Sequence, residues 1–379
     1  MIGRGVGPGG VLGRRVLNRA LLERQMLLRR WKLDAAETTE HLVGLQAQAP
    51  NPPYFGLWTR LDGFRPDNLA RLISERRAVR IALMRSTIHL VTARDCLFLR
   101  PLVQPVLERS LQDGWGRHLE GLDLEAVAAA GRALLEERPR TPKELGKLLA
   151  EQWPDRDPAA LANAVRALAP LVQVPPRGLW GASGPSAHTT AETWLARPLE
   201  GDPSREELVV RYLTAFGPAS VADMQTWSGL TTLHEVTERL RPRLLTFRDE
   251  QGRELFDVAD APFPDPDTPA PPRFLPAYDN VLLSHADRTR IISDDRRRRI
   301  AASRLEVGTV LVDGFVAATW KLTQHRGPAT LRIEPFETLS QADTAAVTQE
   351  GARLLAFAGA DHSGKIQFER AGETRASSW

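Results

Sequence analysis

One pattern occurs three times along the first two thirds of this chain, and it restricts the fold more than any other feature of the sequence. In each copy, apolar residues recur at helical spacing over successive segments, and two short β-rich runs follow. The copies span residues 17–93, 124–194 and 204–258. Some helix starts carry capping sequences, such as Thr141 with Glu144 and Ser204 with Glu207. Because each copy supports the other two, the repetition predicts three related modules in tandem.

The β-rich pair that ends each copy is predicted to form a two-stranded hairpin. The predicted strand pairs are 78–84 with 87–91, 171–174 with 179–181, and 244–247 with 254–258. Three helices followed by a two-stranded wing are typical of the winged form of the helix-turn-helix, whose third helix enters a DNA groove while the wing touches the backbone. The alternative is that some copies only pack and scaffold, and we expect at least one such copy.

The C-terminal third of the chain has a different character. The proline-rich segment 261–273 is predicted to be a stiff, exposed linker. Beyond it, β-rich runs flank a two-residue Asp313-Gly314 turn, and a helix (339–358) and a last strand (366–368) follow. This pattern predicts a small barrel or curled sheet that carries a helix.

The expected fold class is therefore α+β, with three tandem winged-helix domains and a C-terminal β-barrel. The predicted divisions are a flexible tail (1–15), winged helices (16–100, 101–200 and 201–260), the linker (261–273), and a β-barrel domain (274–379) with an Arg-rich hairpin and a C-terminal helix.

Composition narrows the class of protein. A chain of 379 residues with 42% hydrophobic and 26% charged residues is typical of a soluble protein of about two to four domains. No apolar run reaches about 18 residues, and the N-terminus lacks the apolar core of a secretory signal, so we expect a cytoplasmic protein with no membrane partner. One cysteine excludes an internal disulfide. Without a zinc-binding HExxH or a phosphate loop ending in GK[ST], neither a metal nor a cofactor is expected.

The densest group of charges lies between residues 282 and 300. It contains His285, Arg288, Arg290, Arg296, Arg297, Arg298 and Arg299. Four adjacent arginines repel one another and need an anionic partner or free water, and arginines on a protruding loop or hairpin suit phosphate contacts. These residues are therefore predicted to bind DNA, as is Arg85 beside the first wing. The alternative is a solvated loop that Asp287, Asp294 and Asp295 neutralise locally.

Two neutral amides, Gln46 and Gln48, lie where a helical pattern must stop, in a segment (42–54) that contains no Asp or Glu. In an extended segment, residues i and i+2 point the same way, so both amides could face one target. An amide donates and accepts hydrogen bonds but cannot carry a proton away. An active site built on such groups suits a reaction whose leaving group is already activated. The alternative is a polar end to a helix that Thr39 caps at 40–46.

Four segments carry a resemblance to a known family. They are 44–50, with the sequence GLQAQAP, 83–91, with LMRSTIHLV, 275–285, with LPAYDNVLLSH, and 312–321, with VDGFVAATWK. In these segments the chain resembles the winged-helix DNA glycosylases that unhook interstrand crosslinks, the AlkZ-like family of the azinomycin-resistance type. The resemblance implies three winged helices and a β-barrel around a DNA channel.

The resemblance also assigns a reaction. It implies a monofunctional glycosylase acting on N7-alkylated guanine in double-stranded DNA, with Gln46 and Gln48 at the positions of the family's catalytic Gln-x-Gln motif. Some relatives carry Asp at the second position and accept a wider range of lesions, so Gln48 points to the narrower, antibiotic-resistance type. N7-alkylguanine is cationic and leaves as a neutral base, so no general acid is needed, and two amides can position water and stabilise the oxocarbenium-like sugar.

Two other functions compete with this interpretation. A winged-helix transcription regulator binds DNA without chemistry and is expected to dimerise on a two-fold operator. A DNA-damage sensor binds the lesion without cleaving it. Three unlike modules on one chain favour a monomer that surrounds one lesion.

Overall fold

The computed structural model describes residues 9–303, 306–323, 329–359 and 364–369. The first copy of the pattern and its flanks form β1 (Val11–Leu12), α1 (Arg14–Arg24), α2 (Ala35–His41), β2 (Leu45–Gln46), α3 (Pro52–Arg60), α4 (Pro66–Ser74), β3 (Ala78–Ala82), the 3-10 turn η1 (Met84–Ser86) and β4 (Ile88–Thr92). Two helices that the sequence pattern did not predict, α5 (Ala93–Leu102) and α6 (Gln104–Leu119), lead to the second copy.

The second and third copies follow the predicted order of helices. The second contains α7 (Leu124–Glu137), α8 (Pro142–Gln152), α9 (Pro158–Leu168), β5 (Leu171–Gln173), β6 (His188–Thr190) and α10 (Ala191–Leu195). The third contains α11 (Arg205–Phe216), α12 (Val221–Ser228), α13 (Leu233–Leu240), the 3-10 turn η2 (Arg241–Arg243), β7 (Leu244–Asp249) and β8 (Glu254–Val258). Thr141 and Ser204 cap α8 and α11 as predicted.

The hairpins of the first two copies form one sheet. Its order is β2-β4-β3-β5-β6, with every pair antiparallel, and Arg80 of β3 lies opposite Gln173 of β5. Every residue of β3 and β4 is buried, so the first hairpin lies inside the molecule. The predicted second strand at 179–181 is wrong. Leu179 instead closes a turn onto the Pro176 carbonyl, and β6 at 188–190 takes the strand position because it pairs with β5.

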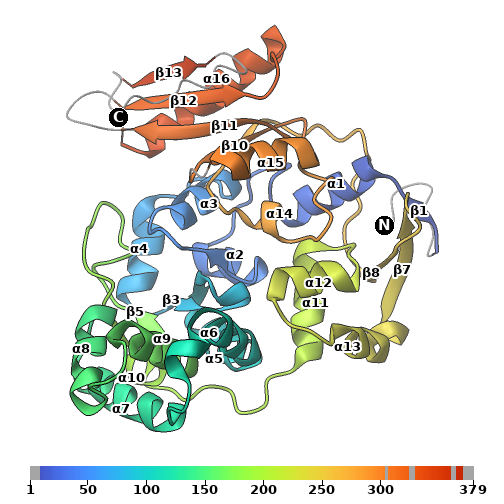
Figure 1. Ribbon diagram of the computed structural model, residues 1–379. Helices are drawn as coiled ribbons and strands as arrows, with labels where there is room; N and C mark the ends of the chain where they lie inside the picture. Colours follow the sequence, from blue (N-terminus) through green and yellow to red (C-terminus); the bar gives the residue numbers. More distant parts are fainter. Residues whose placement is uncertain (1–8, 304–305, 324–328, 360–363, 370–379) are drawn as a thin grey trace.

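The C-terminal region consists of β9 (Arg273–Leu275), α14 (Asn280–Leu283), α15 (Asp294–Ser303), β10 (Gly308–Val312), β11 (Phe315–Thr323), β12 (Thr330–Pro335), α16 (Gln341–Phe357) and β13 (Lys365–Phe368). Its sheet has the order β13-β12-β11-β10-β9. The outer strands β9 and β13 do not pair within the described residues, so this part is an open sheet rather than the predicted closed barrel. The sheet and the helices α7 to α9 lie at opposite ends of the molecule (Figure 1).

Two further local expectations are wrong. Residues 9–15 belong to the fold rather than to a flexible tail, because β1 pairs in parallel with β7 and α1 begins at Arg14; residues 1–8 lie outside the described part. The Arg-rich segment is the helix α15 rather than a hairpin. Asp294 and Asp295 occupy the first turn of α15, where the helix dipole favours acids, and they pair with Arg297 and Arg298 one turn later.

Candidate active site

Gln46 lies in the strand β2 and Gln48 in the bend that follows it, so neither is at a helix end. The helix α2 is capped at its start by Asp34 rather than by Thr39. It ends at His41, because Val43 and Gly44 have positive φ angles of 54° and 91°. Gln46 then pairs with His89 across β2 and β4, and the Ala47 amide donates to the Ile88 carbonyl at 2.7 Å. The expected extended conformation is therefore present at Gln46, whereas Gln48 lies in the bend that follows the strand.

The two amides are held by different donors. Arg85 Nη2 donates to Gln46 Oε1 at 2.9 Å, and the Ile88 backbone N–H donates to Gln48 Oε1 at 3.2 Å. Because both partners can only donate, the oxygen end of each amide is identified without ambiguity. Each carbonyl keeps a second lone pair. Gln46 is 9% exposed, whereas Gln48 is exposed to solvent.

Arg80 supports the segment from inside the sheet. Its guanidinium donates to the Ala47 carbonyl at 2.7 Å and to the Ala49 carbonyl at 3.3 Å, the residues on either side of Gln48. Its Nε donates to Gln173 Oε1 at 3.1 Å. Burial, and to a lesser degree the charge of Arg177, lowers the pKa of Arg80 to about 10, so it stays cationic at neutral pH. Arg80 was not among the site residues predicted from the sequence, although an arginine within an apolar strand was a signal for it.

A residue of the C-terminal region holds the backbone that precedes Gln46. Asn280 Nδ2 donates to the Gly44 carbonyl at 2.8 Å and to the Leu42 carbonyl at 3.3 Å. Its neighbour Asp279 forms a fully buried ion pair with Arg60 of α3 at 2.7 Å. Asn280 lies in segment 275–285, but its part in positioning the glutamines could not be inferred from the sequence.

Arg85 joins the site to the third copy of the pattern. It lies in η1, where both Arg85 and Ser86 have positive φ, and its guanidinium bonds the Trp227 carbonyl as well as Gln46. Burial, followed by the nearby Arg288, lowers the pKa of Arg85 to about 10. The predicted DNA-contact residue is thus engaged with protein oxygens.

His89 is a packed strand histidine. Burial, followed by the charge of Arg85, lowers its pKa to about 3, so it is neutral. Its Nδ1 lies 3.0 Å from the Thr87 carbonyl and carries the proton, since a carbonyl only accepts.

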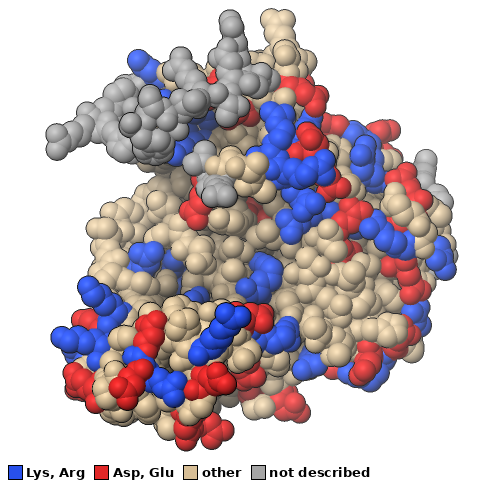
Figure 2. Space-filling model, viewed as in Figure 1, with Lys and Arg blue, Asp and Glu red and all other residues tan. Residues whose placement is uncertain are grey.

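A cavity of about 270 Å³ opens beside Gln48. Its charged and titratable lining residues are Arg140, Arg166, Arg177 and His188, and no carboxylate of the described residues lines it. Burial, followed by the charge of Arg166, lowers the pKa of His188 to about 4. The face drawn in Figure 2 is hollowed between the C-terminal region and α7 to α9, and lysine and arginine side chains lie around this hollow.

The predicted DNA-binding residues separate into two groups. On α15, Arg297, Arg298 and Arg299 are exposed, and basic side chains gather there in Figure 2; Arg296 is half-buried and donates to the Val316 carbonyl at 2.7 Å. His285 and Arg290 are buried against the third copy, where His285 Nε2 lies 3.1 Å from the Phe216 carbonyl and Arg290 donates to the Pro218 carbonyl at 2.8 Å.

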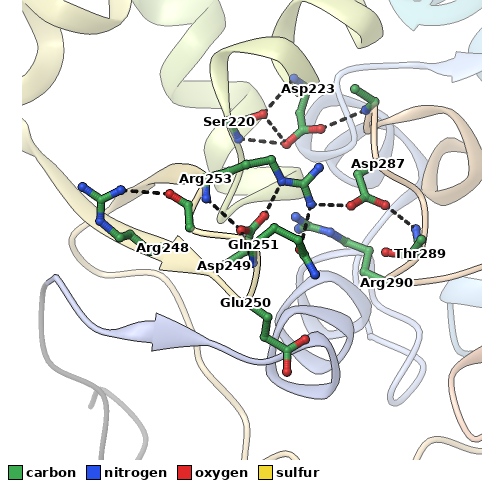
Figure 3. Close-up of polar contacts among 12 residues, drawn as sticks. Ser220, Asp223, Arg248, Asp249, Glu250, Gln251, Arg253, Asp287, Thr289 and Arg290 are labelled. Atoms are coloured by element: carbon green, nitrogen blue, oxygen red, sulfur yellow. Dashed lines mark hydrogen bonds and ion pairs between the residues drawn. The ribbon is translucent and has the colours of Figure 1, made fainter.

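The segment around these buried residues is part of an internal polar contact. Figure 3 shows Arg253 of the third copy reaching Asp287 while also bonding Asp249, with Arg290 nearby. Half-buried Arg288 donates to the His285 carbonyl at 3.3 Å. Because protein oxygens take up these donors, direct DNA contact by His285 and Arg290 does not fit the structure.

No group of three or more His, Cys, Asp or Glu side chains among the described residues is placed to hold a metal ion. None of the described helices is both long and apolar enough to cross a membrane.

Comparison with known proteins identifies the family. No curated protein sequence matches the chain significantly. The structure of a Streptomyces sahachiroi DNA glycosylase, AlkZ, matches 94% of this chain and 99% of its own with a TM-score of 0.77 and 18% identity, which establishes a shared mixed α and β fold. A family model described as DNA glycosylase AlkZ-like matches residues 39–357. The match spans most of the 379 residues, and the chain therefore belongs to the AlkZ-like DNA glycosylase family.

Proposed function

We propose that this protein is a monofunctional DNA glycosylase that hydrolyses the N-glycosidic bond of cationic N7-alkylguanine and thereby unhooks interstrand crosslinks. The observation that carries the proposal is a pair of anchored, uncharged amides, one of them exposed beside a basic cavity without carboxylates. Such a site cannot protonate a poor leaving group. It suits a base that is already positively charged and departs neutral.

The two glutamines are proposed to divide the work. As the bond to the base lengthens, positive charge develops on the sugar, and a fixed carbonyl oxygen stabilises it. The oxygen of Gln46 already accepts from the cationic Arg85, which withdraws electron density from it. The oxygen of exposed Gln48, as far as the described residues go, accepts only from a neutral backbone N–H. We therefore assign the sugar-facing carbonyl to Gln48 and the positioning of water to Gln46.

The DNA surface is proposed to include the exposed arginines of α15 and the third helices of the three copies, α4, α9 and α13, as winged-helix modules. One chain supplies every residue of this arrangement, which fits a monomer. The competing function, a regulator that binds DNA without cleaving it, needs none of the support that Arg80 and Asn280 give to the two glutamines.

The test is release of base from duplex DNA that contains N7-methylguanine or an azinomycin-type crosslink. Wild type is compared with Gln46→Ala, Gln48→Ala and, as a control, Gln251→Ala in the exposed β7–β8 turn. We expect each active-site variant to lose on the order of 100-fold in single-turnover rate, while the control and DNA affinity stay unchanged. DNA binding by wild type without any base release would favour the regulator.

A further inference from the structure

Arg166 and Arg177, two half-buried arginines in the cavity beside Gln48, lack the acceptors that other buried or half-buried arginines of this protein have. Arg24, Arg60 and Arg211 each pair with an aspartate, and Arg140, in the same cavity, pairs with Glu137. Among the described residues, Arg166 forms neither a hydrogen bond nor an ion pair. Within this same part of the chain, Arg177 makes only a long 3.5 Å contact with the Gly184 carbonyl, and its buried Nε has no partner.

The backbone around Arg177 is fixed before any ligand arrives. Gly178 has a φ angle of 96°, and a Cβ there would lie 2.7 Å from Arg80 Cδ. The Gly178 carbonyl accepts a hydrogen bond from the Tyr54 hydroxyl at 2.8 Å. Arg177 therefore lies in a turn that packs closely against the same Arg80 that supports the Gln48 segment.

The lining of the cavity favours an anion with several oxygens. Two half-buried guanidiniums face it, the amides of Gln48 and Asn163 and the Ser186 hydroxyl add polar groups, and no carboxylate competes. Desolvated guanidinium groups without acceptors are costly, and their planar fork of donors matches phosphate. His188 is neutral here and adds no charge.

We propose that this cavity binds a backbone phosphate of the lesion-carrying DNA strand, with Arg166 and Arg177 as its donors. The proposal rests on the proposed function, since Gln48 lines the same cavity and a phosphate seated there lies next to the nucleotide whose sugar faces that amide. The phosphate contact sets the position of the sugar relative to Gln48. Arg166 and Arg177 are then positioning and binding residues, and they take no part in bond cleavage.

The experiment removes one negative charge from DNA at a time. Duplexes with a stable abasic-site analogue at the lesion position carry a single uncharged methylphosphonate at each phosphate near that position in turn. Affinity is measured for wild type, the double variant Arg166→Ala/Arg177→Ala, and Arg138→Ala, an exposed arginine of the same module that does not line the cavity.

We expect one methylphosphonate position to weaken wild-type binding by about tenfold or more. The double variant should bind unmodified DNA more weakly by a similar factor and be insensitive to that one substitution, because both changes remove the same contact. Arg138→Ala should respond like wild type. Equal sensitivity of the double variant and wild type at every position would overturn the proposal.

Two further measurements distinguish a DNA phosphate site from a site for free phosphate and from a folding defect of the double variant. Inorganic phosphate that binds wild type and not the double variant, with no methylphosphonate effect, would mean a free-phosphate site and would sink the DNA assignment. Arg166→Lys/Arg177→Lys keeps both charges and should restore part of the affinity, which guards against a folding defect. Base release is measured separately. If wild type releases base but no methylphosphonate weakens its binding, only this inference is refuted. If one methylphosphonate weakens binding but no base is released, only the proposed function is refuted.

Discussion

The oxygen atoms of Gln46 and Gln48 are positioned by donors from separate parts of the chain. Arg85 holds the first amide directly, while Asn280 holds the backbone before it and Arg80 holds the backbone after it. Hydrogen bonds from charged donors in a dry interior are strong and directional. The site is thus arranged before substrate binds, which is the condition under which a neutral carbonyl stabilises a developing cation well.

Arg80 provides a test of this positioning. Arg80→Lys keeps the charge, but one ammonium group cannot reproduce the spread donors that reach both the Ala47 and Ala49 carbonyls. We expect the single-turnover rate of base release to fall at least about tenfold, since small displacements of catalytic groups are costly, while DNA affinity changes little.

Arg100→Lys is the matched control, because Arg100 is equally buried and also bridges two carbonyls, those of Ala167 and Ala169. The melting temperature is recorded for both variants. A fall in rate that merely parallels a fall in melting temperature, and that Arg100→Lys reproduces, would reduce Arg80 to a structural role.

The two glutamines could be predicted as site residues from the sequence, whereas the residues that position them, Arg80 and Asn280, could not. Gln46 and Gln48 are noticeable because their own segment lacks acids, which is a local property. Arg80 lies 33 positions from Ala47, and Asn280 lies 236 positions from Gly44. Their roles arise only when the chain has folded, so spacing along the sequence carries no trace of them.

At the scale of helices and strands, the sequence correctly predicted the features that depend on neighbouring residues, such as helix starts and tight turns. The helices α8 and α11 begin at the residues whose capping sequences marked them, and the Asp313-Gly314 turn joins β10 to β11. The predictions that are wrong concern segments whose structure depends on contacts with residues far away in the sequence. Pairing with β5 selects β6 as the strand, and pairing with β7 orders the N-terminal residues.

The helix α15 provides a prediction about DNA affinity. Replacing exposed Arg297, Arg298 and Arg299 by alanine should weaken DNA binding and reduce the slope of log affinity against log salt by about one unit for each lost phosphate contact. The rate of base release at saturating DNA should stay unchanged, because in the described part of the chain Gln46 and Gln48 are held by Arg85 and the Ile88 backbone and not by these three arginines. Filter binding over a range of salt concentrations measures the slope.

A second pair of changes on α15 should act in the opposite direction. Asp294 pairs with Arg297 at 3.1 Å and Asp295 with Arg298 at 3.8 Å. Asp294→Asn/Asp295→Asn releases both arginines and should tighten DNA binding. An unchanged salt slope in both sets of variants would remove α15 from the interface.

At the scale of the whole molecule, buried polar groups join the copies to one another and to the C-terminal region. Arg24 of α1 pairs with Asp257 of β8, and Arg211 of α11 pairs with Asp95 of α5. Three buried histidines lie at such junctions: His89 beside the glutamines, His188 in the cavity and His285 against the third copy. Burial is the main reason that their pKa values fall to about 3, 4 and 3, respectively.

These histidines predict acid sensitivity of folding. Each is neutral in the folded protein, whereas an unfolded histidine takes up a proton near pH 6.5. Their contribution to the free energy of unfolding is complete above about pH 6.5 and is lost as the pH falls towards the folded-state pKa values. At pH 5 the loss amounts to about 2 kcal/mol per histidine. The melting temperature should therefore drop between pH 6.5 and 5, and exposed His118→Gln and His234→Gln should leave that drop unchanged.

The same pKa values separate stability from chemistry. The glutamines do not titrate, His89 stays neutral above its pKa of about 3, and the pKa values of Arg80 and Arg85 are about 10. The single-turnover rate, measured well below the melting temperature at each pH, should therefore be flat from about pH 5.5 to 8.5 even though the melting temperature is not. A rate that titrates within that window while the protein stays folded would mean that an ionisable group moves a proton in the reaction, and the mechanism based on two amides would be wrong.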